Sequence, residues 1–139
     1  MGKHDADAQD GRTCAVLTHR GPGVELFNDI AGASVERALD GVAAQQRATA
    51  ANIANAATPG YRAQRVSFAD NLASAIASGQ DPRSAALSTQ DANTPADLSG
   101  NTVQLNSELT NQQRESLQYQ ALAQAMSFKL GLWKSAFEK

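Results

Sequence analysis

Two stretches of the chain place apolar residues at alternating spacings of three and four. This is the pattern of an α-helix that packs lengthwise against another helix. The first stretch runs from about residue 34 to residue 57, with Ser34 as its predicted N-cap. Its seam weakens toward the end, where Gln46 and Thr49 replace large apolar groups. The seam residues are Val35, Leu39, Val42, Gln46, Thr49, Ile53 and Ala56.

The second stretch, residues 105–139, continues the same spacing without a break. Asn106 is predicted to cap this helix, and Glu108 places a negative charge in the first turn, where it favours the helix dipole. A second apolar stripe on the same helix implies that it needs more than one neighbour. The first stripe comprises Leu105, Leu109, Gln112, Ser116, Tyr119, Ala123, Met126, Leu130, Trp133 and Phe137, and the second Leu117, Ala121, Gln124, Phe128 and Leu132.

The segments around these helices carry weaker signals. Leu26, Phe27 and Ile30 are predicted to form a short amphipathic turn that leads into the first helix. Apolar spacing over residues 66–77 predicts a short amphipathic helix capped by Ser67. Residues 78–102 are rich in Ser, Thr, Asn, Asp, Gly and Pro, which favours loop or disorder.

The predicted fold is all-α. It has two long N- and C-terminal helices that form a coiled-coil-like pair, joined by a short helix and a largely irregular loop. The predicted organisation is a disordered extension over 1–25, the first helix and its turn over 26–61, the short helix and a flexible linker over 62–102, and the C-terminal helix over 103–139.

Composition narrows the functional classes. Among 139 residues, 42% are hydrophobic but many of these are alanine, and only 5% are aromatic, so large core side chains are scarce. A formal charge of -2 gives no electrostatic reason to expect nucleic acid. No apolar run approaches the ~18 residues of a membrane span. Residues 1–23 lack an apolar segment flanked as in a cleavable signal peptide, so none is predicted.

No residue constellation predicts catalysis, a metal site or a cofactor. The single cysteine, Cys14, excludes an internal disulfide. Cys14, His4 and His19 lie in a segment without periodicity and lack the paired spacing of metal ligands. The carboxylates are scattered, with no close pair in an apolar setting for acid–base work. We therefore expect no enzyme activity.

The most specific motif closes the first helix and reads A-N-I-A-N-A-A-T-P-G-Y over residues 51–61. Pro59 cannot continue the helical ladder, and Gly60 tolerates the positive φ that follows proline in a type II turn. Asn52 and Asn55 are three residues apart and therefore share one helix face. Spacing alone favours two polar side chains on a solvent-facing last turn.

This run resembles the signature of the bacterial flagellar axial proteins, which are the rod, hook and hook-associated components. The short length and the C-terminal half are most similar to the proximal rod proteins of that family. The similarity there is carried by Gly100–Leu105, Glu108, Tyr119–Gln120 and Leu132–Phe137. The resemblance covers roughly residues 26–137.

The resemblance implies a structural subunit of the flagellar basal-body rod that transmits torque and lines the export channel. It implies a homo- and hetero-oligomeric helical assembly with other rod subunits, the basal-body adaptor protein and the export-gate complex. It also implies a place in the rod in the periplasmic space, reached through flagellar type III export without a cleaved signal peptide. The implied assembly motif is Ala51, Asn52, Ile53, Ala54, Asn55, Thr58, Pro59, Gly60 and Tyr61, and the implied C-terminal packing residues are Leu105, Leu109, Tyr119, Met126, Leu130, Trp133 and Phe137.

Two alternatives stay open on the sequence alone. A sibling rod component of the same family would share the first motif, and a small cytosolic helical adaptor would bind one partner stoichiometrically. The residues themselves favour assembly, because two isolated helices with Gln, Ser and Thr in their seam are marginal in water. We therefore expect the isolated chain to be weakly helical, with helicity that rises with concentration or with a partner.

Overall fold

The computed structural model describes residues 29–137, without the side chain of Phe137. The predictions for residues 1–25, for Cys14 and the two histidines, and for Leu26 and Phe27 lie outside this range. The described elements are α2 (Ile30–Ala54), β1 (Gln64–Ser67), α3 (Ala69–Ala77), the 3-10 turn η1 (Pro82–Ser84), β2 (Ser88–Asp91) and α4 (Leu105–Phe137).

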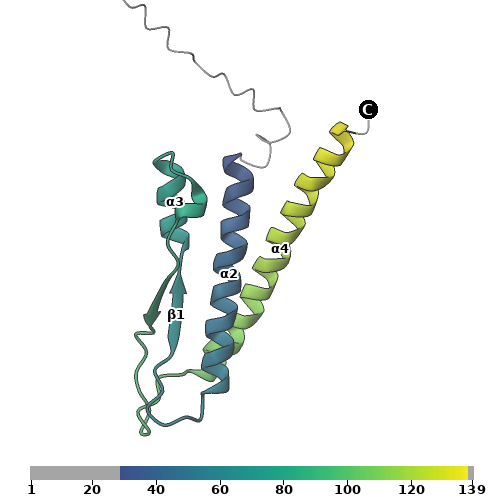
Figure 1. The fold of residues 1–139 in the computed structure, drawn as a ribbon. Coiled ribbons are helices and arrows are strands. Elements are labelled where there is room, and N and C mark those ends of the chain that lie inside the picture. Colours follow the sequence, from purple (N-terminus) through teal and green to yellow (C-terminus); the bar gives the residue numbers. More distant parts are fainter. Residues whose placement is uncertain (1–28, 138–139) are drawn as a thin grey trace, which may run out of the picture.

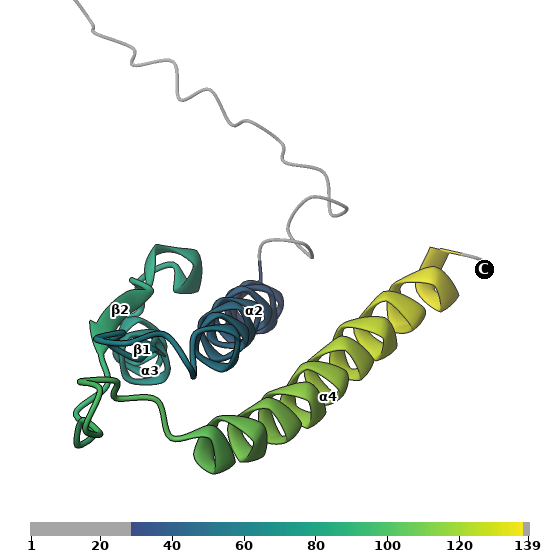
Figure 2. The same ribbon diagram turned by 90° about the horizontal axis from the view of Figure 1, so that it is seen from below.

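The central element is α2. An arm made of β1, α3, η1 and β2 lies along one side of it, and α4 lies along the other (Figure 1). Seen along α2, α4 approaches it at one end and moves away toward the C-terminus (Figure 2). The chain is thus mostly helical, and the prediction of two long helices near its ends is confirmed.

The start of α2 differs from the prediction. The carboxylate of Asp29 accepts a hydrogen bond from the Gly32 backbone N–H at 2.6 Å, so Asp29 is the N-cap. The predicted cap Ser34 lies inside the helix, where its hydroxyl donates to the Ile30 carbonyl at 2.6 Å. The sequence offered two capping residues, and the one farther upstream starts the helix. The predicted left-handed conformation of Gly60 is confirmed, with φ of 70°.

The two-stranded sheet was not predicted. β1 and β2 pair antiparallel from Gln64 opposite Asp91 to Ser67 opposite Ser88. Ser67 therefore ends a strand and does not cap α3, whose N-cap position is Phe68. Residues 78–102, predicted as irregular, contain η1 and β2. Each strand is four residues long, and Val66 is the single apolar residue of the two, so neither shows the apolar alternation that reveals a strand.

The apolar core is thin. Among the described residues, five of the seven buried apolar side chains are alanines. Phe68 is the largest of the seven. Its ring lies against the backbone of α2, so close that a Cβ added at Gly41 would fall 2.5 Å from the ring. Gly41 is therefore required for this close approach. The buried apolar residues are Ala33, Val42, Ala63, Phe68, Ala75, Ala85 and Ala92.

The face that α4 turns toward α2 coincides with the predicted apolar seam only toward the C-terminus, at Met126 and Trp133. Its buried residues are polar near the start of the helix, and half-buried apolar residues follow toward the C-terminus. Of the seam residues whose side chains the structure describes, only Ala123, Met126 and Trp133 are half-buried. Asn106 lies inside the helix and does not cap it, whereas Glu108 does lie in the first turn. The α2-facing set is Glu108, Asn111, Glu115, Leu122, Met126 and Trp133.

Candidate functional site

The motif at the end of α2 organises the chain around one asparagine. Asn52 is fully buried, with 0% of its surface exposed. Its carboxamide oxygen accepts the backbone N–H of Gln64 at 2.9 Å, and its Nδ2 donates to the backbone carbonyl of Gln64 at 2.9 Å. A side-chain amide thus pairs with a strand backbone much as a neighbouring strand would. Asn52 therefore fixes the start of β1 against α2.

A buried carboxylate joins α4 to the same point. The Nδ2 of Asn52 also donates to Oε2 of Glu108 at 3.3 Å, and Nη2 of Arg65 donates to Oε1 of Glu108 at 3.3 Å. The hydroxyl of Tyr61 donates to Oδ1 of Asn52 at 3.4 Å. Glu108 is only 2% exposed, so its charge depends on these partners. Together these contacts tie α2, β1 and α4 at one end of the molecule.

Two residues that precede α4, Asn101 and Thr102, also form hydrogen bonds to this end of the molecule. Nδ2 of Asn101 donates to the carbonyls of Asn55, Ala56 and Thr58 at 2.9, 3.2 and 2.8 Å. These are carbonyls that the end of α2 and its turn leave without a helical partner. The hydroxyl of Thr102 accepts the Ala63 backbone N–H at 2.8 Å. One asparagine thus caps the C-terminal end of α2 from a distant part of the sequence.

The two motif asparagines share a face but have different roles. Asn52 is buried, which overturns the solvent-facing interpretation for this residue. Asn55 is half-buried, and its Nδ2 donates to the Ala51 carbonyl at 2.8 Å while its Oδ1 accepts the Thr58 hydroxyl at 3.2 Å. The remaining motif residues split into half-buried Ile53 and Tyr61 and exposed Ala51, Ala54, Thr58, Pro59 and Gly60.

A second buried carboxylate lies one heptad along α4. Glu115 is 5% exposed, and its Oε1 accepts the Thr49 hydroxyl at 3.0 Å. Its Oε2 has no hydrogen-bond partner among residues 29–137. Burial raises the pKa of Glu115, and the nearby charge of Glu108 acts in the same direction, against the hydrogen bond from Thr49 and the charges of Arg114 and Arg65.

Sequence reasoning missed this polar stripe. Glu108 and Glu115 are seven residues apart, and Asn111 falls between them at the spacing of the same helix face. That periodicity was available as a signal. It was outweighed by the apolar stripes beside it, because carboxylates are seldom buried unless they are paired. The partners that satisfy Glu108 come from α2 and β1, far from it in sequence.

The outward faces of α4 carry the large apolar side chains. Phe128 and Leu117 are 71% and 68% exposed, and with Leu132, which is 55% exposed, they are the large apolar members of the second predicted stripe. Four residues of the first stripe are also exposed, each by more than two fifths of its surface. These four are Leu105, Leu109, Tyr119 and Leu130, of which Leu130 also lines a pocket between α4 and α2.

The described residues do not point to other chemistry. Within residues 29–137 no group of three or more His, Cys, Asp or Glu side chains is arranged to hold a metal ion. Of the helices in that range, none combines the length and the hydropathy that crossing a lipid bilayer would require. The site consists of a buried hydrogen-bonded cluster around Asn52 and Glu108, called the clamp below, at one end of the helix pair. An exposed apolar surface lies on the outside of α4.

Comparison with known proteins adds independent evidence. A family described as "Flagella basal body rod protein" matches residues 36–62, which cover most of α2 and the motif turn. The flagellar basal body rod protein FlgB of Escherichia coli K12 is 36% identical over 112 residues, covering 66% of this chain and 81% of the relative. FlgB of Shigella flexneri matches with the same identity and coverage. The similarity therefore extends well beyond the motif.

Proposed function

The chain belongs to the flagellar basal body rod protein family and is a structural subunit of the rod, and we propose that it enters the rod through the outward faces of α4. Both relatives carry the name of the rod component FlgB, which is the rod component that this chain resembles. Its neighbours in the basal body are other rod components. Contacts with those components have to form on surface that the single chain leaves exposed.

The exposed apolar surface of α4 carries the proposal. Seven large apolar side chains of this helix are exposed, while the buried core consists mostly of alanine. Fully burying a Leu- or Phe-sized side chain contributes about 1.5–3 kcal/mol. Soluble monomers rarely leave contiguous apolar surface of this kind uncovered. Helices of neighbouring subunits packed against both stripes would bury it and complete the coiled-coil-like packing predicted from the sequence.

The motif end supplies a second contact surface in this proposal. Ala51, Ala54, Pro59 and Gly60 are exposed there and are small or compact, so a neighbouring backbone can approach closely. Beneath them the clamp around Asn52 holds the turn in one shape. A preorganised surface loses less entropy on docking than a mobile one. The motif thus serves assembly indirectly, through the fixed geometry of its end.

The mechanism that we propose is mechanical. Repeated head-to-tail contacts that do not close generate an open helical array, which suits a rod. Packed helices in such an array transmit torque and leave a central channel for exported subunits. The further partners proposed are the basal-body adaptor protein and the export-gate complex. We place the chain in the periplasmic part of the rod, reached by export without a cleaved signal peptide.

The test removes apolar surface without touching the fold of the single chain. The variant carries Phe128→Ser and Leu132→Ser, and the matched control carries Gln113→Ser and Gln120→Ser on exposed positions of the same helix. In cells that lack the natural gene, we expect the first variant to abolish hook–basal bodies and swimming, and the control to restore both. Purified monomers should have equal helicity.

Two outcomes would overturn the proposal. Normal rod assembly by the Phe128→Ser, Leu132→Ser variant would show that the outer stripe is not a subunit contact. Retention of the wild-type chain in the cytosol, in a stoichiometric complex with one soluble partner, would favour the adaptor alternative.

A further inference from the structure

In the half of α4 nearest the motif, the buried side chains are polar and the leucines are exposed. The buried residues of this half, called the polar face below, are Glu108, Asn111 and Glu115. Leu105 and Leu109 lie on the first turns of the same helix, and both are exposed. The helix therefore turns two carboxylates and an amide inward, although leucines are available a short rotation away.

A small rotation of α4 about its own axis would reverse this arrangement. Each residue step turns an α-helix by about 100°, because one turn takes about 3.6 residues. A rotation by one step would bring Leu109 to the place of Glu108 and Ser116 to the place of Glu115. The face turned inward would then be the apolar seam that the sequence predicts, so two rotations of α4 compete for the same site on α2.

Hydrogen-bond donors on α2 and β1 explain which rotation is adopted. The Thr49 hydroxyl donates to Oε1 of Glu115 at 3.0 Å. Nδ2 of Asn52 and Nη2 of Arg65 donate to the two carboxylate oxygens of Glu108, each at 3.3 Å. A leucine accepts no hydrogen bond, and a buried donor that loses its acceptor is destabilising. The observed rotation is thus the one that satisfies these donors.

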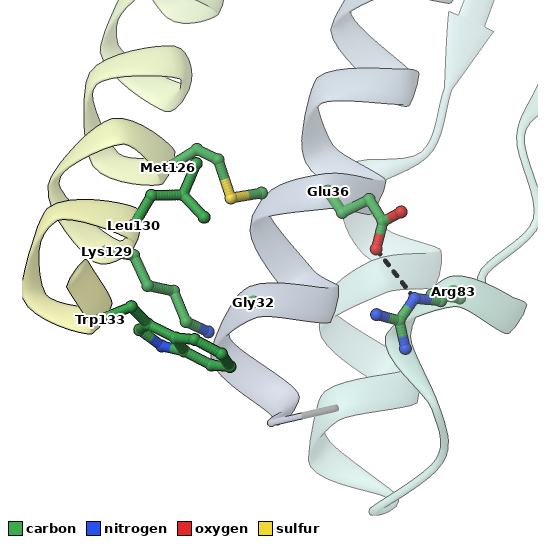
Figure 3. A pocket seen from close by; sticks show the side chains of 7 residues that line it. All are labelled: Gly32, Glu36, Arg83, Met126, Lys129, Leu130 and Trp133. Atoms are coloured by element: carbon green, nitrogen blue, oxygen red, sulfur yellow. Dashed lines mark hydrogen bonds and ion pairs between the residues drawn. The ribbon is translucent and has the colours of Figure 1, made fainter. Parts of the chain in front are cut away.

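The far half of α4 lacks this discrimination. There Met126 and Trp133 lie across from Gly32 at the start of α2 (Figure 3). Apolar contacts of this kind are non-directional and do not distinguish one rotation from another. Lys129 forms an ion pair with Asp29, but both side chains are partly exposed, and exposed pairs contribute little. The choice between rotations is therefore made at the motif end.

We propose that the polar face determines which side of α4 packs on its own α2. Its members are positioning residues, because they act by keeping other side chains outside. The side chains kept outside include Leu105, Leu109 and Tyr119, which the other rotation would turn toward α2. The use of these side chains by neighbouring subunits rests on the proposed function, whereas the selection of the face is a property of the single chain.

The test compares two disulfides in the purified full-length chain, in a Cys14→Ser background. Val42 and Leu122 line one groove between α2 and α4, so Val42→Cys with Leu122→Cys reports the observed rotation. Val42→Cys with Ala123→Cys reports a rotation by one residue. Bridged Cα atoms lie roughly 4.4–6.8 Å apart, so the yields show which residue faces Val42. Under mild oxidation of the monomer, we expect several-fold more of the first disulfide.

Removing one hydrogen-bonded layer should relax the choice. Thr49→Val with Glu115→Leu replaces both partners by apolar groups, which is often neutral or stabilising. We expect the ratio of the first disulfide to the second to fall about threefold or more, as the loss of one hydrogen bond implies. The urea midpoint should equal or exceed that of the parent. A stable variant with an unchanged ratio would overturn the proposal.

Two controls separate hydrogen bonding from added apolar surface. Gln113→Leu introduces a leucine at an exposed position and leaves the polar face intact, so the ratio should not change. Glu115→Gln keeps an acceptor for Thr49 and should also preserve the ratio. An equal fall in Gln113→Leu would show that apolar surface alone sets the rotation, and would reject the proposal.

A milder variant covers the case in which the double substitution unfolds the chain. Thr49→Val alone removes the hydroxyl and keeps the shape of the side chain, so the ratio should fall by a smaller factor. An unchanged ratio in this variant would again reject the proposal.

The cross-linking result is independent of rod assembly. An unchanged ratio, together with failed assembly of the Phe128→Ser, Leu132→Ser variant, would reject face selection and leave the proposed function standing. A reduced ratio, together with normal assembly of that variant, would support face selection and reject the proposed role of the outer stripe.

Discussion

The two ends of the α2–α4 pair are built on opposite principles. At the motif end the helices are close, and what lies between them is polar and satisfied by hydrogen bonds, as Asn52 and Glu108 show. At the other end the helices diverge, and apolar side chains such as Met126 and Trp133 line a groove. The residues best suited to a core lie where the single chain closes least.

The two ends therefore contribute differently to assembly: the polar end fixes the conformation, and the apolar surface provides the binding free energy. A buried amide or carboxylate tolerates only arrangements that satisfy it, so the motif end is fixed in one conformation. Apolar surface is non-directional and accepts many neighbours. A rod subunit benefits from this division, because the fixed end sets the angle at which the apolar faces of α4 are offered to its neighbours.

The largest expected effect tests whether the motif end depends on one side chain. Asn52→Ala leaves the backbone N–H and carbonyl of Gln64 unpaired and removes one partner of Glu108. We expect a loss of about 2–4 kcal/mol in the free energy of unfolding, since an unsatisfied buried group costs roughly 1–3 kcal/mol. Urea denaturation followed by circular dichroism measures it.

Its matched control is Asn55→Ala, three residues along the same face. Asn55 bonds to Ala51 within the helix and to the Thr58 hydroxyl, both close to solvent, so the loss should be below about 1 kcal/mol. Similar costs for the two variants would contradict the central role of Asn52 and leave the two asparagines equivalent, as their spacing alone suggests.

A pair of glycines provides the next contrast. Gly41→Ala places a methyl group 2.5 Å from the ring of Phe68. By contrast, nothing lies within 4 Å of a Cβ added at Gly131, in the part of α4 that diverges from α2. Alanine normally stabilises a helix interior by up to about 1 kcal/mol relative to glycine. We expect Gly131→Ala to raise the thermal midpoint and Gly41→Ala to lower it, at a cost of about 1–3 kcal/mol. Midpoints that rise in both variants would show that Phe68 is not packed against α2.

The same contrast explains what the sequence could reveal. Periodicity located the two long helices, and the Pro59-Gly60 pair correctly predicted a turn with positive φ at Gly60. These features depend on residues near one another in the chain. The exposed stripe of Leu117, Phe128 and Leu132 was also visible in the periodicity, although the sequence could not say whether these residues pack within the chain.

What the sequence concealed depends on distant partners. Asn52 can be buried because its carboxamide forms hydrogen bonds with the backbone of Gln64. Glu108 can be buried because Arg65 and Asn52 donate hydrogen bonds to its carboxylate. The β1–β2 pairing was hidden for a similar reason, since only β1 packs against α2, β2 is held by β1, and neither short strand has an apolar pattern of its own. Polar burial has no local signature and becomes visible only once the fold is known.

The smallest expected effect concerns Glu115, whose buried Oε2 has no hydrogen-bond partner within residues 29–137. Because burial raises the pKa of Glu115 above its ordinary 4.5, the folded state binds this proton more tightly than the unfolded state does. The stability contributed by this proton is complete below pH 4.5 and is lost as pH rises through the raised pKa. Asp29, Asp91 and Asp97 have lowered pKa values, so their contributions are lost only as pH falls below 3.8.

Glu115→Gln should therefore flatten the fall in stability above pH 4.5 and raise stability at neutral pH by about 1 kcal/mol or less. Thr49→Val provides the opposing variant. It removes the hydrogen bond that stabilises the ionised carboxylate, so it should steepen the same fall. Urea midpoints measured across this pH range distinguish the two. Parallel pH profiles for wild type and both variants would mean that water reaches Oε2 of Glu115 freely, and that burial does not raise its pKa.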